Sequence, residues 1–117
     1  MLKERSDIVM FNGISAPIPK NVEQFGKVTS EMQRLYAEKN RRYGNAFSRR
    51  FKEYGMMSSV LRLDDKMERL KYLCQVPVDY GDESMRDTLV DLANYAIMTI
   101  MELDSLEEKR AKALSKK

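Results

Sequence analysis

The sequence predicts an all-α fold, a four-helix-bundle-like single domain with an extended N-terminal arm and a helical C-terminal tail. Three observations support this prediction. Apolar residues recur every three or four positions over most of residues 21–103, short loops separate these segments, and the only strand-like patch lies near the N-terminus. We expect an arm over residues 1–20, a helical domain over 21–104 and a charged helical tail over 105–117.

Composition narrows the chemistry. Of the 117 residues, 43% are hydrophobic and 33% are charged, as in a globular protein of ordinary size. No apolar run approaches the length of a membrane span, and charged residues stand where a signal peptide would be apolar, so we expect a cytoplasmic location. The single Cys74 and the absence of histidine argue against disulfides, zinc, haem and histidine catalysis. Any metal ion bound by this chain would therefore be a hard cation with oxygen ligands, Mg²⁺ or Mn²⁺.

The arm, residues 1–20, shows no sustained helical period. Gly13, Pro17 and Pro19 break any helix there. The apolar run 8–11 is either a small strand or an arm laid over a partner chain. These residues are therefore left outside the predicted helical domain.

A first helix is expected over residues 21–42, with an apolar face made by Val22, Phe25, Val28, Met32, Leu35 and Tyr36. Gly26 weakens its first turns, so a start at Thr29 or Ser30 is the alternative. Gly44 and Asn45 then predict a turn and a new N-cap.

The next two helices are predicted over residues 46–54 and over about 57–75. The shorter one would bury Phe47 and Phe51, with Tyr54 as a further candidate. The longer one has a predicted core stripe of Val60, Leu63, Met67, Leu70 and Cys74. A second, polar stripe lies within roughly 80° on another side and comprises Arg62, Asp65, Arg69 and Tyr72. Its charges are either ordinary surface ion pairs or part of a site.

Positive charge is concentrated around the second helix, although the net charge of the chain is only +3. The cations are Arg41, Arg42, Arg49, Arg50 and Lys52. Such a run is either a solvated helical face or an anion-binding surface, and the sequence favours neither.

An acidic helix is expected over residues 82–103, with Asp82 as its N-cap. At about 100° per residue, one narrow arc holds Glu83, Asp87, Asp91 and Asn94. Most of the remaining circumference is apolar, which predicts a buried helix. Carboxylates facing a cleft would then require a cation or basic partners. The alternative is that these carboxylates lie in solvent and interact favourably with the positive N-terminal end of the helix dipole.

Three blocks of sequence resemble one family, the nucleotide modification associated domain type 1, over about residues 30–104. The blocks are Lys39-Asn40-x-x-Tyr43-Gly44-Asn45-x-Phe47, Arg62-Leu63-x-Asp65-Lys66-x-x-Arg69-Leu70 and Asp82-Glu83-Ser84-x-x-Asp87-Thr88-x-x-Asp91-Leu92-Ala93-Asn94-Tyr95-Ala96. The resemblance implies a small helical domain of bacteriophages and prophages, active in nucleotide metabolism or DNA-base modification in the cytoplasm of a bacterial host.

A more distant similarity is to the MazG-like all-α nucleoside triphosphate pyrophosphohydrolases, which hold magnesium with Glu-x-x-Glu and Glu-x-x-Asp on neighbouring helices. Here Asp65-x-x-Glu68 and Glu83-x-x-x-Asp87 would take those places. The first pair begins with aspartate, and the second has one extra intervening residue, so the similarity supports nucleotide binding better than hydrolysis.

The leading hypothesis is a magnesium-assisted nucleotide site. The predicted metal ligands are Asp65, Glu83, Asp87 and Asp91, with Glu83 and Asp87 also as catalytic candidates. The predicted nucleotide-binding residues are Lys39, Asn40, Tyr43, Arg62, Lys66, Arg69, Asn94 and Tyr95. Two alternatives stay open: a non-catalytic protein that sequesters a nucleotide, such as a defence signal, without metal, and an interaction scaffold with no ligand.

We also expect a homo-oligomer, at least a dimer. Leu61 and Tyr72 point away from the predicted core stripe, and the acidic helix is apolar over more of its surface than one small domain covers. Pairing two chains would bury this surface and could bring basic residues of one chain over the carboxylates of the other. The other expected partner is a nucleotide, with no membrane and no sequence-specific nucleic acid.

Overall fold

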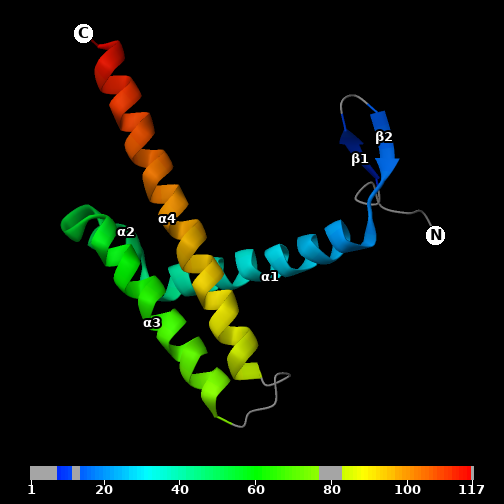
Figure 1. The fold of residues 1–117 in the computed structure, drawn as a ribbon. Coiled ribbons are helices and arrows are strands. Elements are labelled where there is room, and N and C mark those ends of the chain that lie inside the picture. The colour runs from blue at the N-terminus through cyan, green and yellow to red at the C-terminus, as the bar shows by residue number, and fades with distance from the viewer. Residues whose placement is uncertain (1–7, 12–13, 77–82, 117) are drawn as a thin grey trace. The chain divides into compact units, whose positions relative to one another are not determined.

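The computed structural model describes residues 8–11, 14–76 and 83–116. These residues form two strands and four helices (Figure 1), and they confirm the predicted all-α fold. The chain divides into two compact units, Met1–Lys39 and Asn40–Lys117, with the boundary inside the last turn of the first helix. No helix in the described residues is long and apolar enough to cross a membrane.

The first unit begins with a β-hairpin. Strands β1 (Ile8–Phe11) and β2 (Ile14–Pro17) pair antiparallel, with Phe11 opposite Ile14. The small strand predicted at 8–11 is confirmed, whereas its partner was missed. An Asn12-Gly13 dipeptide between two short apolar runs is the sequence signal that favours such a hairpin.

Helix α1 (Lys20–Tyr43) starts one residue before the predicted boundary. Gly26 lies within its first turns, and Thr29 donates its side-chain hydroxyl to the Gly26 carbonyl at 3.1 Å. The alternative start at Thr29 or Ser30 is therefore wrong. A single exposed glycine costs a helix only about 1 kcal/mol relative to alanine, which the rest of the helix outweighs.

Helix α2 (Ala46–Tyr54) has the predicted bounds and lies wholly within the second unit. Gly44 adopts φ 67°, in the left-handed region that glycine favours. Asn45 occupies the N-cap position, but its side chain makes no capping hydrogen bond. Phe51 is buried as predicted, whereas Tyr54 is exposed, contrary to its candidacy for the core.

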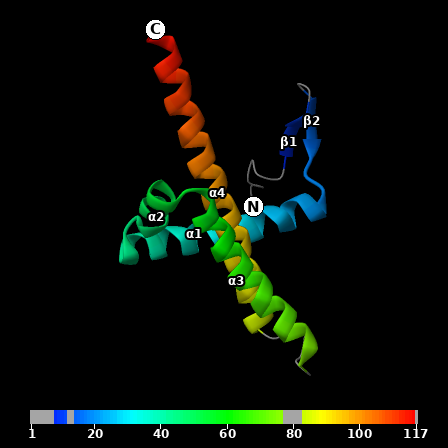
Figure 2. The same cartoon turned by 60° about the vertical axis from the view of Figure 1, so that its left-hand side comes forward.

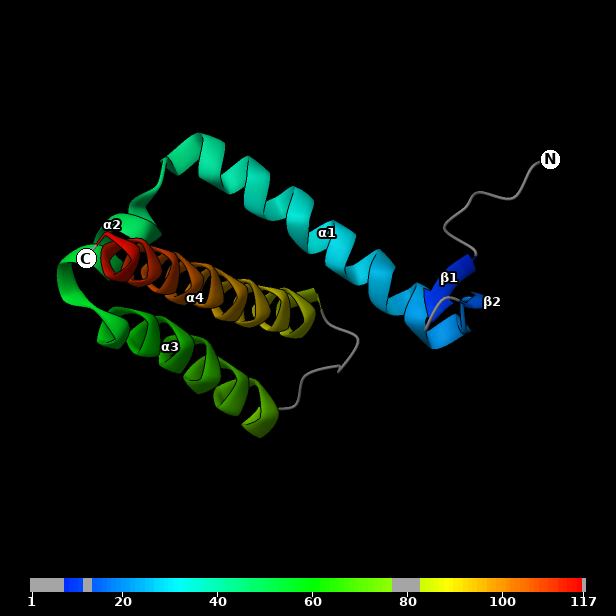
Figure 3. The ribbon, with the colours of Figure 1, turned by 90° about the horizontal axis from the view of Figure 1, so that it is seen from above.

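A single residue, Gly55, separates α2 from α3 (Met56–Gln75). Figure 3 shows the sharp turn of the chain between the two helices. Gly55 has φ 77° and ψ −163°, a conformation that side-chain-bearing residues avoid. Its carbonyl accepts two hydrogen bonds from Ser58, one from the backbone N–H at 3.0 Å and one from the hydroxyl at 2.8 Å. These bonds hold the first turn of α3.

Helix α4 (Glu83–Ser115) runs antiparallel to α3 along their shared length (Figures 1 and 3). The acidic helix and the predicted tail form one continuous helix. Figure 2 shows the orange and red end of α4 continuing past the beginning of α3. The predicted N-cap Asp82 and the loop over residues 77–82 lie outside the described residues.

The packed side of α3 differs from the prediction by one residue of helical rotation. Ser59 and Leu73 are buried, whereas Cys74 is exposed and Val60 and Met67 are each 41% exposed. The predicted core stripe is therefore wrong at these three positions. The prediction followed the more apolar stripe of the helix. The small side chain of Ser59 allows closer packing between helices than the β-branched side chain of Val60 would.

The described part of α4 is less buried than its composition predicts. Val90 is buried, together with the two hydroxyl-bearing residues Thr88 and Thr99. Large apolar side chains remain exposed along the helix: Leu89, Ile97, Ile100, Met101, Leu103, Leu106 and Leu114. The expectation of a helix buried on most sides is wrong for the chain by itself, since α3 and α2 cover only part of its circumference.

Candidate functional site

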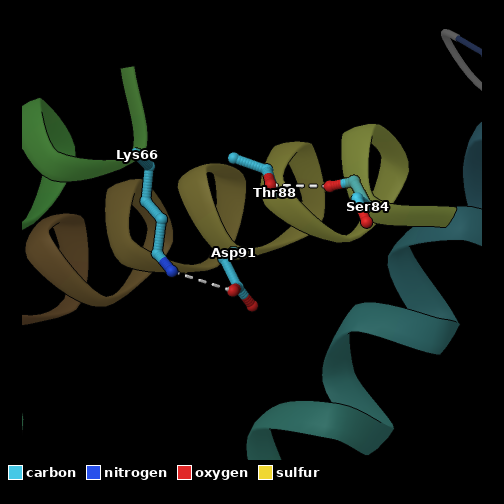
Figure 4. A network of polar contacts seen from close by, with 4 residues as sticks. All are labelled: Lys66, Ser84, Thr88 and Asp91. Carbon is cyan, nitrogen blue, oxygen red and sulfur yellow. Dashed lines mark hydrogen bonds and ion pairs between the residues drawn. The ribbon is translucent and has the colours of Figure 1, made fainter. Parts of the chain in front are cut away.

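An ion pair joins α3 to α4 near the middle of their contact. Lys66 Nζ lies 3.1 Å from Asp91 Oδ2, with both side chains pointing to the same side of the helix pair (Figure 4). The Lys66 side chain is 27% exposed and that of Asp91 is 28% exposed. Partial burial reduces solvent screening, so this pair is expected to be stronger than fully exposed pairs on the same helix.

Helical geometry places further charged residues along the same edge. Three cations of α3, Arg62, Lys66 and Arg69, lie within an arc of about 60° and span about 10 Å along the helix axis. Because α4 runs antiparallel and Lys66 meets Asp91, Asp87 lies one turn toward Arg69. We call this the α3–α4 edge, defined as Arg62, Lys66, Arg69, Asp87, Asp91 and Asn94.

Among the described residues of the α3–α4 edge, an ion pair joins the two helices only in the middle, between Lys66 and Asp91. Arg62 and Asn94 are partly buried, whereas Arg69 and Asp87 are exposed. No ion pair joins Asp87 to either arginine within the part of the chain that the structure describes. The edge therefore presents guanidinium groups to solvent on both sides of a fixed lysine.

Two threonines of α4 satisfy their buried hydroxyls within their own helix. Thr88 Oγ1 donates to the Ser84 carbonyl at 2.6 Å (Figure 4), and Thr99 Oγ1 donates to the Tyr95 carbonyl at 2.7 Å. Neither hydroxyl then needs a partner on α3. The sequence reasoning missed both residues because it followed only apolar and charged side chains.

Tyr95 stacks on a residue of α2. The rings of Phe47 and Tyr95 lie 5.9 Å apart between centroids at an interplanar angle of 25°. This contact fixes α2 against α4 and occupies one face of the tyrosine ring. Tyr43, which is 68% exposed, is the more open of the two rings predicted to stack on a base.

The remaining predicted residues are only partly brought together. Lys39, Asn40 and Tyr43 lie in the last turns of α1, and all three are exposed. Lys39 belongs to the first compact unit, while the other two belong to the second.

The predicted metal ligands do not gather within the described residues. Asp87 and Asp91 lie one turn apart on α4, and Asp65 is exposed on α3. The side chain of Glu83 lies outside the described part of the chain. Among the residues described, no group of three or more His, Cys, Asp or Glu side chains is placed to hold a metal ion.

Comparison with known proteins identifies the family. No curated protein and no solved structure matches the chain. A family model, nucleotide modification associated domain 1, matches residues 39–103, which is more than half of the chain. The match contains α2, α3, most of α4 and every residue of the α3–α4 edge. The chain belongs to the nucleotide modification associated domain 1 family.

Proposed function

We propose that the α3–α4 edge binds the phosphate groups of a nucleotide. The observation that carries this proposal is the partly buried ion pair between Lys66 and Asp91. Asp91 holds the ammonium group in one place while leaving it accessible from solvent. A cation positioned before the ligand arrives loses less side-chain entropy on binding.

The spacing of the cations matches the size of the ligand. Arg62, Lys66 and Arg69 span about 10 Å along one side of α3, the length of a short chain of linked phosphates. Arginine presents a planar fork of donors that suits phosphate oxygens, and lysine adds a compact charge. A nucleoside di- or triphosphate is long enough to contact all three.

The two carboxylates of the edge set the requirement for a cation. A phosphate bound beside Asp87 and Asp91 is repelled unless positive charge intervenes. Magnesium or manganese held by these residues, with Glu83 and Asp65 as further predicted ligands, would supply that charge. When bound, such an ion activates water for attack on a phosphoanhydride, the reaction of a pyrophosphohydrolase.

Sequestration of a nucleotide without turnover is the second candidate function. The contact between Lys66 and Asp91 favours it, because Asp91 is already neutralised by a side chain of the protein. The same cations would then bind phosphate without a metal. The bacteriophage setting that the family resemblance implies makes a defence-signalling nucleotide one candidate ligand.

Isothermal titration of the full chain with nucleoside triphosphates, in magnesium and again in EDTA, separates these functions. We expect Lys66→Met to weaken binding by about 10- to 100-fold, the value of a charge-assisted hydrogen bond. Lys71→Met is the matched control, because Lys71 lies on the exposed side of α3 and pairs with Glu68. Equal losses in both variants would contradict the assignment of the α3–α4 edge.

Turnover requires its own assay. Pyrophosphate release from a panel of common and modified nucleoside triphosphates with magnesium would establish hydrolysis. We expect Glu83→Gln and Asp87→Asn to abolish release with the fold intact. Tight nucleotide binding in EDTA, together with no pyrophosphate release across the panel, would favour sequestration over hydrolysis as the function.

We further propose that the chain functions as a homo-oligomer. Within the described residues, four hydrophobic side chains are buried, while many large apolar ones on α3 and α4 remain exposed. Burying these in a second copy would contribute about 25 cal/mol per Å². Light scattering at micromolar concentration should give at least twice the 13.7 kDa of one chain. A monomer that keeps its nucleotide affinity would contradict the oligomer but not the binding site.

A further inference from the structure

A second charged surface lies apart from the α3–α4 edge, on the last turn of α1 and on α2. We call it the basic surface, defined as Arg41, Arg42, Tyr43, Arg49, Arg50, Lys52 and Tyr54. All seven side chains are exposed. We propose that the basic surface binds single-stranded nucleic acid, independently of its sequence.

The positive charge of the basic surface is not compensated by ion pairs within the residues that the structure describes. Its five cations face a single acidic residue, Glu53, within residues 40–54. None of the five forms an ion pair within the described residues, unlike Lys27, Lys66 and Lys71. Clustered cations without partners repel one another and attract a polyanion. A nucleic-acid backbone supplies regularly spaced negative charges and gains entropy from the release of its counterions.

The packing of α2 fixes the direction of one of these charges, Arg49. Phe51 is buried, and Phe47 stacks on Tyr95 of α4, so one side of α2 is held against the unit. Arg49 lies about 160° around the helix from Phe51 and therefore projects to the opposite side. Its Nη1 atom lies 3.9 Å from the position that a Cβ at Gly44 would take. This guanidinium thus joins the charges of α2 to those at the end of α1.

Two exposed tyrosines distinguish single-stranded nucleic acid from other polyanions. Tyr43, the last residue of α1, is 68% exposed, and Tyr54, the last residue of α2, is 67% exposed. Unpaired bases stack on such rings whatever their sequence, whereas the bases of a duplex are already stacked. A membrane surface would instead require aliphatic side chains beside the cations. None is present on α2 among its exposed residues, Arg49, Arg50, Lys52, Glu53 and Tyr54.

Fluorescence anisotropy of a labelled 20-nucleotide oligo-dT with the full chain, at several salt concentrations, tests the proposal. Affinity should fall with salt. Arg49→Gln with Arg50→Gln should lower the slope of log K against log salt by about 0.7 for each phosphate that these arginines neutralise. Lys109→Gln with Arg110→Gln on the exposed end of α4 removes the same charge and should leave the slope unchanged.

Tyrosine variants test stacking. Tyr43→Ala or Tyr54→Ala should weaken oligo-dT binding by about 5- to 100-fold. Tyr72→Ala, which removes a 62% exposed ring from α3, should have no effect. Circular dichroism verifies that each variant keeps its helices. The arginine variants of the basic surface should not alter nucleotide titrations that depend on Lys66.

Several results would overturn the proposal. They are no binding of oligo-dT, unchanged binding in the double arginine variant, unchanged binding in both tyrosine variants, and equal loss in the α4 control. Inorganic polyphosphate that competes as well as oligo-dT would point to a general polyanion surface and would also reject it. Binding to phosphatidylserine vesicles but not to oligo-dT would assign the surface to a membrane instead.

Discussion

Gly55 donates its backbone N–H to the carbonyl of Phe51 at 2.7 Å, and this hydrogen bond closes α2 at the point where α3 begins. With φ 77° and ψ −163°, Gly55 turns the chain without any intervening loop. The orientation of α3 relative to α2 thus depends on one residue that can adopt this conformation.

Gly55→Ala is therefore expected to lower the free energy of unfolding by about 1–3 kcal/mol. The loss would come from backbone strain, since a Cβ at this position meets no atom within 4 Å. Gly26→Ala is the matched control, because its Cβ also meets nothing and its backbone is helical. We expect that control to raise stability by up to about 1 kcal/mol. Thermal unfolding measures both effects. An unchanged free energy of unfolding in Gly55→Ala would contradict the expectation that this backbone conformation is strained for alanine.

A double-mutant cycle should reveal coupling between Lys66 and Asp91. We expect Lys66→Met and Asp91→Asn to have a coupling energy of about 1 kcal/mol, given their partial burial. The cycle on Lys71 and Glu68, which are 60% and 64% exposed, should give about 0–0.5 kcal/mol. Urea unfolding at low and high salt measures the two cycles. Equal coupling in both pairs would show that burial contributes nothing to the Lys66 contact.

Ser59→Ala should leave stability unchanged or raise it. The Ser59 hydroxyl is fully buried and has no hydrogen-bond partner among the described residues, so its removal relieves a desolvation penalty. Ser58→Ala serves as the control, since it loses a 2.8 Å hydrogen bond to Gly55 and should cost about 0.5–1.5 kcal/mol. A marked destabilisation by Ser59→Ala would indicate that a water molecule or a partner chain satisfies the hydroxyl.

Removal of residues 107–117 should change the melting temperature little. The family match ends at residue 103, and every described side chain from residue 106 onward is exposed. Backbone that is exposed and lacks tertiary contacts contributes little to folding. Differential scanning calorimetry measures the effect, and light scattering shows whether the end of α4 takes part in oligomer formation. A large loss of stability without a change in mass would contradict this prediction.

The number of helices and the bounds of α1, α2 and α3 were predictable because their signals are local, whereas the continuation of α4 to Ser115 as one helix was not predicted. Gly44 and Gly55 mark the ends of α2, and the recurrence of apolar residues marks α3 and α4. The hairpin was missed because each strand has only four residues. The alternation in such short segments is weak, and Gly13 followed by Pro17 and Pro19 indicates the absence of a helix more strongly than the presence of a strand pair.

The packed face of α3 was not predictable from hydrophobicity. Ser59 lies in the packed side because it is small, and the more apolar Val60 is left partly exposed. The candidate site was predictable in part. Spacing placed Asp91 on the acidic arc, and the family resemblance pointed to Lys66, but their pairing depends on the register between two helices, which no local pattern specifies. The stacking of Phe47 on Tyr95 depends on the same long-range information.

The order of the helices in the second unit has a kinetic consequence. Helix α2 packs on α3, and α3 packs on α4, so the main contacts join neighbours along the chain. Loops between neighbours close with a small loss of entropy, and helical domains of this kind fold within microseconds to milliseconds. The α3–α4 hairpin can therefore form as soon as both helices have left the ribosome, before any second copy is encountered. Assembly of the proposed oligomer, rather than folding of the chain, would then set the rate at which active protein accumulates.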